Sequence, residues 1–144
     1  MDYQILNLLF RCNKEFSHEK IRKQKLSDTE CMICSYIYSH ENCSQDDVSA
    51  ALKTDKTTVG KALVSLENKA CVVRAQDAAD KRIKRLSLTD VGREKVAELV
   101  DIHNHWLRDI MTYLSEEEQN QFENYCVRLL AAAEKLTDNG ETRP

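Results

Sequence analysis

Four basic residues lie within five positions of one short segment, and positive charge at this density can bind phosphate groups. The segment is DAADKRIKRLSLT at residues 77–89, and its basic residues are Lys81, Arg82, Lys84 and Arg85. Lysine and arginine neutralise phosphates, and arginine can also enter the minor groove of DNA. These side chains make double-stranded DNA the first candidate partner.

Charge is distributed unevenly along this chain of net charge −3. Residues 53–85 contain nine Lys and Arg against four Asp and Glu, which gives +5, whereas the remainder contains 12 basic and 20 acidic residues. Binding to DNA depends on the local field more than on the net charge. A basic run alone usually marks a solvated surface, so the elements around it decide the interpretation.

A helix predicted over about 56–69 precedes the basic segment. Its apolar residues Val59, Leu63 and Leu66 recur at helical spacing and predict one buried face. The remaining faces carry small hydroxyls and lysine, which can donate hydrogen bonds to phosphates and base edges. Together with an arginine on the next strand, the predicted DNA-binding residues of this region are Lys56, Thr57, Thr58, Lys61, Ser65 and Arg74.

The rest of the pattern predicts a mainly α protein. Three glycines and one proline are too few for a fold rich in β-turns. Capping boxes mark helix starts at SDTE (27–30) and SEEE (115–118), and SQDD (44–47) is a weaker version. Helices are predicted at about 2–23, 28–39, 45–52, 56–69, 90–113 and 116–136, and strands at 71–76 and 83–88. Two short helices followed at once by a hairpin form a helix-turn-helix with a wing.

From about residue 26 to 92 the chain resembles the MarR family of winged-helix regulators. The resemblance rests on LSDTEC (26–31), DKTTVGKALVSLENKACVVR (55–74) and DAADKRIKRLSLTDVG (77–92). The family's wing pattern is matched at Asp77, Asp80, Arg82, Leu86, Leu88, Thr89 and Gly92.

Two positions depart from the family pattern. Ala70 replaces the glycine that usually follows the recognition helix. A left-handed conformation there would cost alanine about 1 kcal/mol, so we expect the helix to end differently, for example one residue later. Gly60 lies inside the helix, where it either lets the backbone approach DNA closely or is simply tolerated.

The resemblance implies one domain over residues 1–144, with a winged helix-turn-helix lobe at 26–89 and dimerisation helices at 1–25 and 90–137. It implies an obligate homodimer. The apolar residues expected at its interface, which could equally form the core of one chain, are Leu8, Leu9, Trp106, Ile110, Tyr113, Phe122 and Leu129.

The function that the resemblance implies is transcriptional regulation, and we expect a repressor of a pseudo-palindromic operator. The recognition helix would enter the major groove. Arg82, held by Asp80, would enter the minor groove. Lys81, Lys84 and Arg85 would contact phosphates or contribute to the field.

The signal that releases the protein from DNA stays open on the sequence alone. The resemblance implies a small aromatic or lipophilic effector bound between the dimerisation helices and the lobe, and no cofactor. The alternatives are that there is no ligand, that Cys12 and Cys126 form a thiol sensor, or that Cys31, Glu98 and His103 form a zinc site.

CMIC at residues 31–34 is interpreted as part of the core rather than as a reactive site. It lies inside an apolar helical pattern in which Met32 and Ile33 are expected to be buried. Buried cysteine behaves as a small hydrophobic residue.

Other classes of protein are disfavoured. A winged-helix module that binds only proteins usually lacks a basic wing tip. An enzyme would need a catalytic motif, and the sequence contains no Gly-rich phosphate loop, HExxH or GxSxG. No apolar run approaches the roughly 20 residues of a membrane span. The N-terminus lacks the features of a signal peptide, so we expect a cytoplasmic protein.

Overall fold

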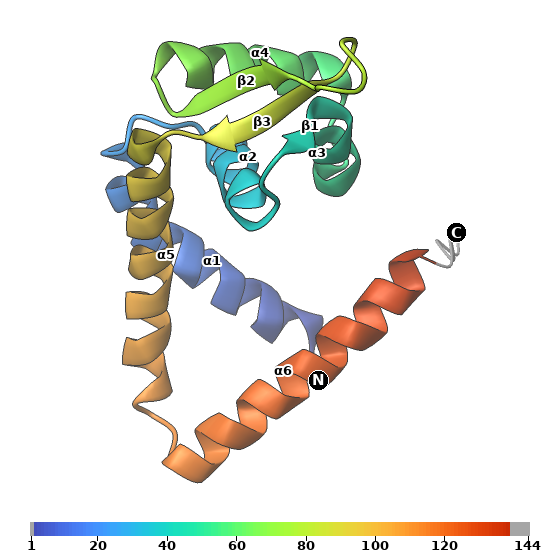
Figure 1. Cartoon of the computed structure of the whole chain (residues 1–144). Coiled ribbons are helices and arrows are strands. Elements are labelled where there is room, and N and C mark those ends of the chain that lie inside the picture. Colours follow the sequence, from blue (N-terminus) through green and yellow to red (C-terminus); the bar gives the residue numbers. More distant parts are fainter. Residues whose placement is uncertain (1, 139–144) are drawn as a thin grey trace. The chain divides into compact units, whose positions relative to one another are not determined.

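The computed structural model describes residues 2–138, in which helices predominate over a small sheet (Figure 1). The elements are α1 (Tyr3–Arg22), α2 (Asp28–Ser39), β1 (Cys43–Ser44), α3 (Gln45–Leu52), α4 (Lys56–Asn68), β2 (Val72–Gln76), β3 (Lys84–Leu88), α5 (Asp90–Met111) and α6 (Glu116–Asp138). The mainly α winged helix-turn-helix fold is confirmed, and every predicted element lies within two residues of its expected bounds.

Backbone contacts divide the chain into a unit that ends at Asn104 and a unit that begins at His105. The first unit contains the helix-turn-helix and the hairpin. The predicted assignment of residues 1–25 and 90–137 to dimerisation stays a prediction. Within residues 2–138, no helix is both long and apolar enough to cross a membrane.

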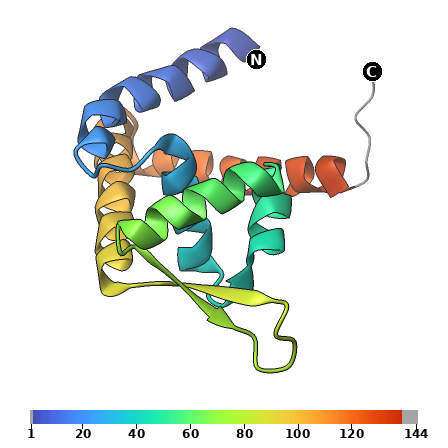
Figure 2. The same ribbon diagram turned by 90° about the horizontal axis from the view of Figure 1, so that it is seen from above.

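The sheet is antiparallel, with the strand order β1–β3–β2. Cys43 pairs with Leu86, and Val72 pairs with Leu88. Strand β1 escaped prediction because two residues cannot show the alternation that indicates a strand. Figure 2 shows the loop between β2 and β3 extending away from α2, α3 and α4, so the wing tip is open to a partner.

The core of the first unit lies between α2, α3, α4 and the sheet, and three cysteines belong to it. Cys34, Cys43 and Cys71 are buried free thiols. Burial raises the pKa of the Cys34 thiol to about 12, so at neutral pH this cysteine is protonated and weakly nucleophilic. The prediction for Met32 is wrong, since it is 51% exposed. The buried stripe of α2 runs through Ile33, Cys34 and Ile37 and leaves Met32 beside it.

Ala70 adopts a left-handed conformation at the end of α4. Its φ is 56°. The amide of Ala70 donates to the carbonyl of Glu67 at 2.9 Å, and that of Cys71 donates to Leu66 at 2.9 Å. These bonds form a Schellman motif, whose left-handed position favours glycine. The expected later end of the helix is therefore wrong: the helix ends at Asn68 and alanine bears the strain.

Ala70→Gly is expected to raise the free energy of unfolding by about 1 kcal/mol, because glycine adopts a positive φ without a Cβ penalty. Urea denaturation of the full chain measures the difference. Asn68→Gly is the matched control. It introduces glycine two positions earlier, at the last residue of the helix, and should destabilise by roughly a few tenths of a kcal/mol. Equal effects of the two substitutions would contradict the assigned strain.

Candidate nucleic-acid interface

The first turn of α4 is fixed by Asp55, which caps the helix. One carboxylate oxygen of Asp55 accepts from the backbone amide of Thr58 at 2.8 Å. The other oxygen accepts from the hydroxyl of Thr58 at 2.6 Å. These hydrogen bonds hold the pKa of Asp55 below its usual value. The Thr58 hydroxyl therefore serves the cap, while Thr57 is exposed beside it.

The outward face of α4 differs in part from the one expected. Its buried face consists of Val59, Leu63 and Leu66, as predicted. The residues opposite this face at helical spacing are Thr57, Lys61, Val64 and Asn68, all of which are exposed. Val64 and Asn68 were missed. The i, i+4, i+7, i+11 spacing from Thr57 would have identified both.

Ser65 lies at the side of α4, next to a buried carboxylate. It is half-buried, and its hydroxyl hydrogen-bonds to Glu30 on α2. Glu30 also accepts from Lys69 Nζ at 2.7 Å and from the amide of Ser27 at 2.8 Å. Burial raises the pKa of Glu30, but the hydrogen bonds from Lys69, Ser65 and Ser27 outweigh it and leave the pKa below its usual value. Ser65 thus helps to join the start of α2 to the end of α4.

At the wing tip, Asp80 and Arg82 form a bidentate pair. The guanidinium donates to the two carboxylate oxygens at 3.1 and 3.0 Å, and the amide of Arg82 donates to Asp80 at 3.0 Å. The side chain of Arg82 is nevertheless 91% exposed. The hydrogen bonds from Arg82 hold the pKa of Asp80 below its usual value. The pair fixes the arginine in one orientation while leaving it open to a partner.

At the base of the wing, Asp77 and Arg85 brace the hairpin. Arg85 Nε donates to Asp77 at 2.6 Å. The other oxygen of Asp77 accepts the amides of Ala79 and Asp80 at 2.8 and 3.0 Å. Arg85 is thus bound within the wing, and its expected contact with phosphate or contribution to the field stays a prediction.

Four other predicted cations divide between internal pairs and open positions. Arg74 donates to Glu67 at 2.7 Å and is mostly covered, so it also acts within the chain. Lys56 Nζ lies 3.0 Å from Oδ1 of Asp46, and both side chains are exposed. Lys81 and Lys84 are exposed. The cations that face solvent at the wing are therefore Lys81, Arg82 and Lys84.

The titration of Asp77 reports on the wing brace. The hydrogen bond from Arg85 and those from the amides of Asp80 and Ala79 lower the pKa of Asp77 to about 2. An unfolded Asp titrates near about 3.9, so the pair stabilises the wing above this pH and the contribution is lost as the pH falls through about 2. An NMR titration of the Asp77 carboxyl is expected to show this depressed midpoint. In Arg85→Gln the midpoint should rise, and an unchanged midpoint would contradict the pairing.

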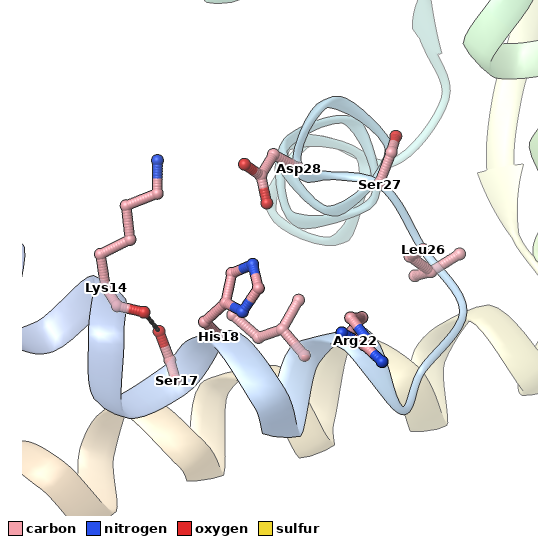
Figure 3. A pocket seen from close by; sticks show the side chains of 8 residues that line it. Lys14, Ser17, His18, Arg22, Leu26, Ser27 and Asp28 are labelled. Atoms are coloured by element: carbon pink, nitrogen blue, oxygen red, sulfur yellow. Dashed lines mark hydrogen bonds between the residues drawn. The ribbon is translucent and has the colours of Figure 1, made fainter.

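One pocket of the first unit lies between the start of α3 and the wing and is lined by Ser44, Gln45, Asp46, Asp47, Arg74, Arg82, Ile83, Lys84 and Arg85. Two further pockets of this unit lie beside α1 and α5. The smaller lies between α1 and the start of α2, where Lys14, His18 and Arg22 form its basic side and Asp28 lies across from them (Figure 3). The larger, which we call the α2–α5 pocket, is mostly apolar and is lined by Ile21, Cys31, Met32, Ser35, Tyr36, Ser39, His40, Leu52, Leu99, Val100 and His103.

The candidates for a redox or zinc signal are not gathered into a site. Cys31 and His103 line the α2–α5 pocket, whereas Glu98 hydrogen-bonds to Gln24. Within residues 2–138, no three His, Cys, Asp or Glu side chains lie where they could hold a metal ion. Cys12 and Cys126 are exposed free thiols. The thiol-sensor hypothesis for this pair stays a prediction.

Comparisons with known proteins agree with this geometry. A family model described as the MarR family matches residues 24–83. The HTH-type transcriptional regulator BilQ of Clostridioides difficile (strain CD3) is 25% identical over 126 residues, which cover 84% of each protein. The transcriptional repressor MprA of Escherichia coli (strain K12) is 25% identical over 128 residues, covering 88% of this chain and 73% of MprA.

Solved structures share the fold over nearly the whole chain. A mutant of S. aureus MepR, solved bound to an oligodeoxyribonucleotide, superposes with a TM-score of 0.69 and is 26% identical. The match covers 92% of this chain and 99% of the MepR chain.

Proposed function

The chain belongs to the MarR family of winged-helix regulators and is a DNA-binding regulator, and from this membership we propose that it is a repressor that binds a pseudo-palindromic operator as a homodimer. In a two-fold dimer, two copies of α4 enter successive major grooves about one helical turn apart. Each wing reaches the adjacent minor groove with Arg82.

The observation that carries this proposal is the arrangement of Asp80 and Arg82. A guanidinium that is held by two hydrogen bonds and still 91% exposed loses little conformational entropy on binding. The pair lies in the segment of local charge +5 (residues 53–85) that also contains α4. A narrow minor groove has enhanced negative potential that attracts arginine.

The homodimer is supported by apolar side chains that one chain leaves uncovered. Five large apolar residues on the first half of α1 are exposed, namely Tyr3, Ile5, Leu8, Leu9 and Phe10. On α6 the exposed apolar residues include Phe122, Tyr125, Val127, Leu129 and Leu130. Apolar surface of this extent marks an interaction site. Five of the seven residues expected at the interface are exposed, and they are Leu8, Leu9, Tyr113, Phe122 and Leu129.

The α2–α5 pocket is the site we assign to the effector, a small aromatic acid. Met32, Leu99 and Val100 offer an apolar surface for a ring. His103 and His40 are the groups at its edge that could bind a carboxylate. A ligand that contacts both α2 and α5 would change the position of the winged helix-turn-helix lobe. The DNA would then be released.

Binding of the full chain to a labelled duplex from its own upstream region tests the function. We expect binding of the upstream duplex to exceed that of a scrambled duplex of equal length. Affinity for both should fall steeply between about 50 and 200 mM salt, because counterions are released from the phosphates. Equal affinity for the two duplexes would contradict an operator, and salt-independent binding or none would favour a protein-binding module.

Two further measurements separate the finer parts of the proposal. Sedimentation of Leu8→Asp should show monomers, since it places a charge in the apolar interface.

Benzoate should release DNA from the unaltered chain but not from Val100→Trp, which fills the α2–α5 pocket. Lys14→Ala in the smaller pocket is the control and should leave release by benzoate intact.

A further inference from the structure

A single large apolar side chain lies on the outward face of α4. Val64 is 50% exposed. The structure describes all of α4, and no other large hydrophobic residue of this helix is exposed. It shares the face with Thr57, Lys61 and Asn68. Valine is also a weaker helix former than alanine, so neither burial nor helix propensity accounts for it here.

The neighbours of Val64 limit what it can bind. A docking face for another protein needs a contiguous apolar patch, whereas the neighbours of Val64 on this face, Lys61 and Asn68, carry an ammonium and an amide. Valine cannot hydrogen-bond to phosphate or to the donors and acceptors of base edges. The apolar group that the major groove presents at a base edge is the C5-methyl group of thymine.

We propose that Val64 is a specificity residue that contacts a thymine methyl group in each half of the operator. The inference rests on the proposed function, in which α4 enters the major groove. It adds a base preference to that function: thymine is favoured at one fixed position of each half-site.

The test uses duplexes selected from a random library by the full chain and by Val64→Ala. The unaltered chain should select thymine at one position of each half-site, and Val64→Ala should lose this preference alone. Replacement of that thymine by deoxyuridine removes only the methyl group. This replacement should weaken binding of the unaltered chain about fourfold per half-site, the ratio expected when the burial of one methyl group is lost. It should not weaken binding of Val64→Ala.

Val73→Ala is the matched control. Val73 is 51% exposed but lies on β2, away from the outward face of α4. It should leave both the selected sequence and the deoxyuridine effect unchanged. Val64→Ala is expected to fold, because alanine favours the helix.

The outcomes separate this inference from the proposed function. Selection of an operator by both chains with the same thymine preference would overturn the role of Val64 and leave the repressor proposal standing. An operator in which deoxyuridine is tolerated at every thymine would do the same. Failure of the unaltered chain to select any sequence would overturn both proposals.

Discussion

Arg82→Ala is expected to lower operator affinity by about 100-fold or more at fixed salt. A hydrogen bond to a charged group contributes roughly 1.5–3 kcal/mol, and a dimer loses two such contacts. The loss should appear in DNA binding and not in folding, since Arg82 is 91% exposed and an exposed ion pair adds little stability. Fluorescence anisotropy with the operator duplex and thermal denaturation of the free chain measure the two effects.

Lys81→Ala is the matched control for Arg82→Ala. It removes the same charge from the neighbouring exposed position. If Lys81 only contributes to the field, its loss should lower affinity by much less than the loss of Arg82. Asp80→Asn should give an intermediate loss, because Arg82 remains but is no longer held by a carboxylate. Equal losses for Arg82→Ala and Lys81→Ala would mean that Arg82 acts only as a charge.

Gly92→Ala is expected to destabilise the chain by about 3 kcal/mol or more, in spite of alanine's advantage in a helix. A Cβ at Gly92 would lie 2.1 Å from the carbonyl oxygen of Cys71 and 3.0 Å from its carbonyl carbon. Both are backbone atoms of the core, and the same oxygen accepts the amide of Thr89 at 3.0 Å. The start of α5 would have to move away from the lobe. Urea denaturation measures the change.

Gly60→Ala is the control for Gly92→Ala, because it makes the same substitution inside another helix. A Cβ at Gly60 would lie 3.3 Å from Nε2 of Gln45, the end of a flexible side chain. We expect a change between zero and a gain of about 1 kcal/mol. A comparable loss at both positions would contradict the close backbone approach at Gly92. The space at Gly60 is occupied in part by Gln45, a neighbour that neither sequence-based explanation of this glycine considered.

Local interactions explain why so much of the fold could be predicted. The capping box of α2 joins residues three apart, and both of its hydrogen bonds are present at Ser27 and Glu30. The weaker box at Ser44 is complete as well. Helical spacing identified Val59, Leu63 and Leu66, which are all fully buried. The same reasoning misplaced Met32, because a short apolar run does not define which side of a helix is buried.

The sequence by itself determined the helices, the wing and the pairing of Asp80 with Arg82, because each depends on residues close together in the chain. Tertiary structure decided how the other charges are used. Glu30 meets Lys69 across 39 positions, and Arg85 turns inward to Asp77 at the base of the wing. Such contacts depend on how the elements pack and not on local spacing. For this reason a basic segment visible in the sequence became, in the folded chain, a brace at the base of the wing and one held, exposed arginine at its tip.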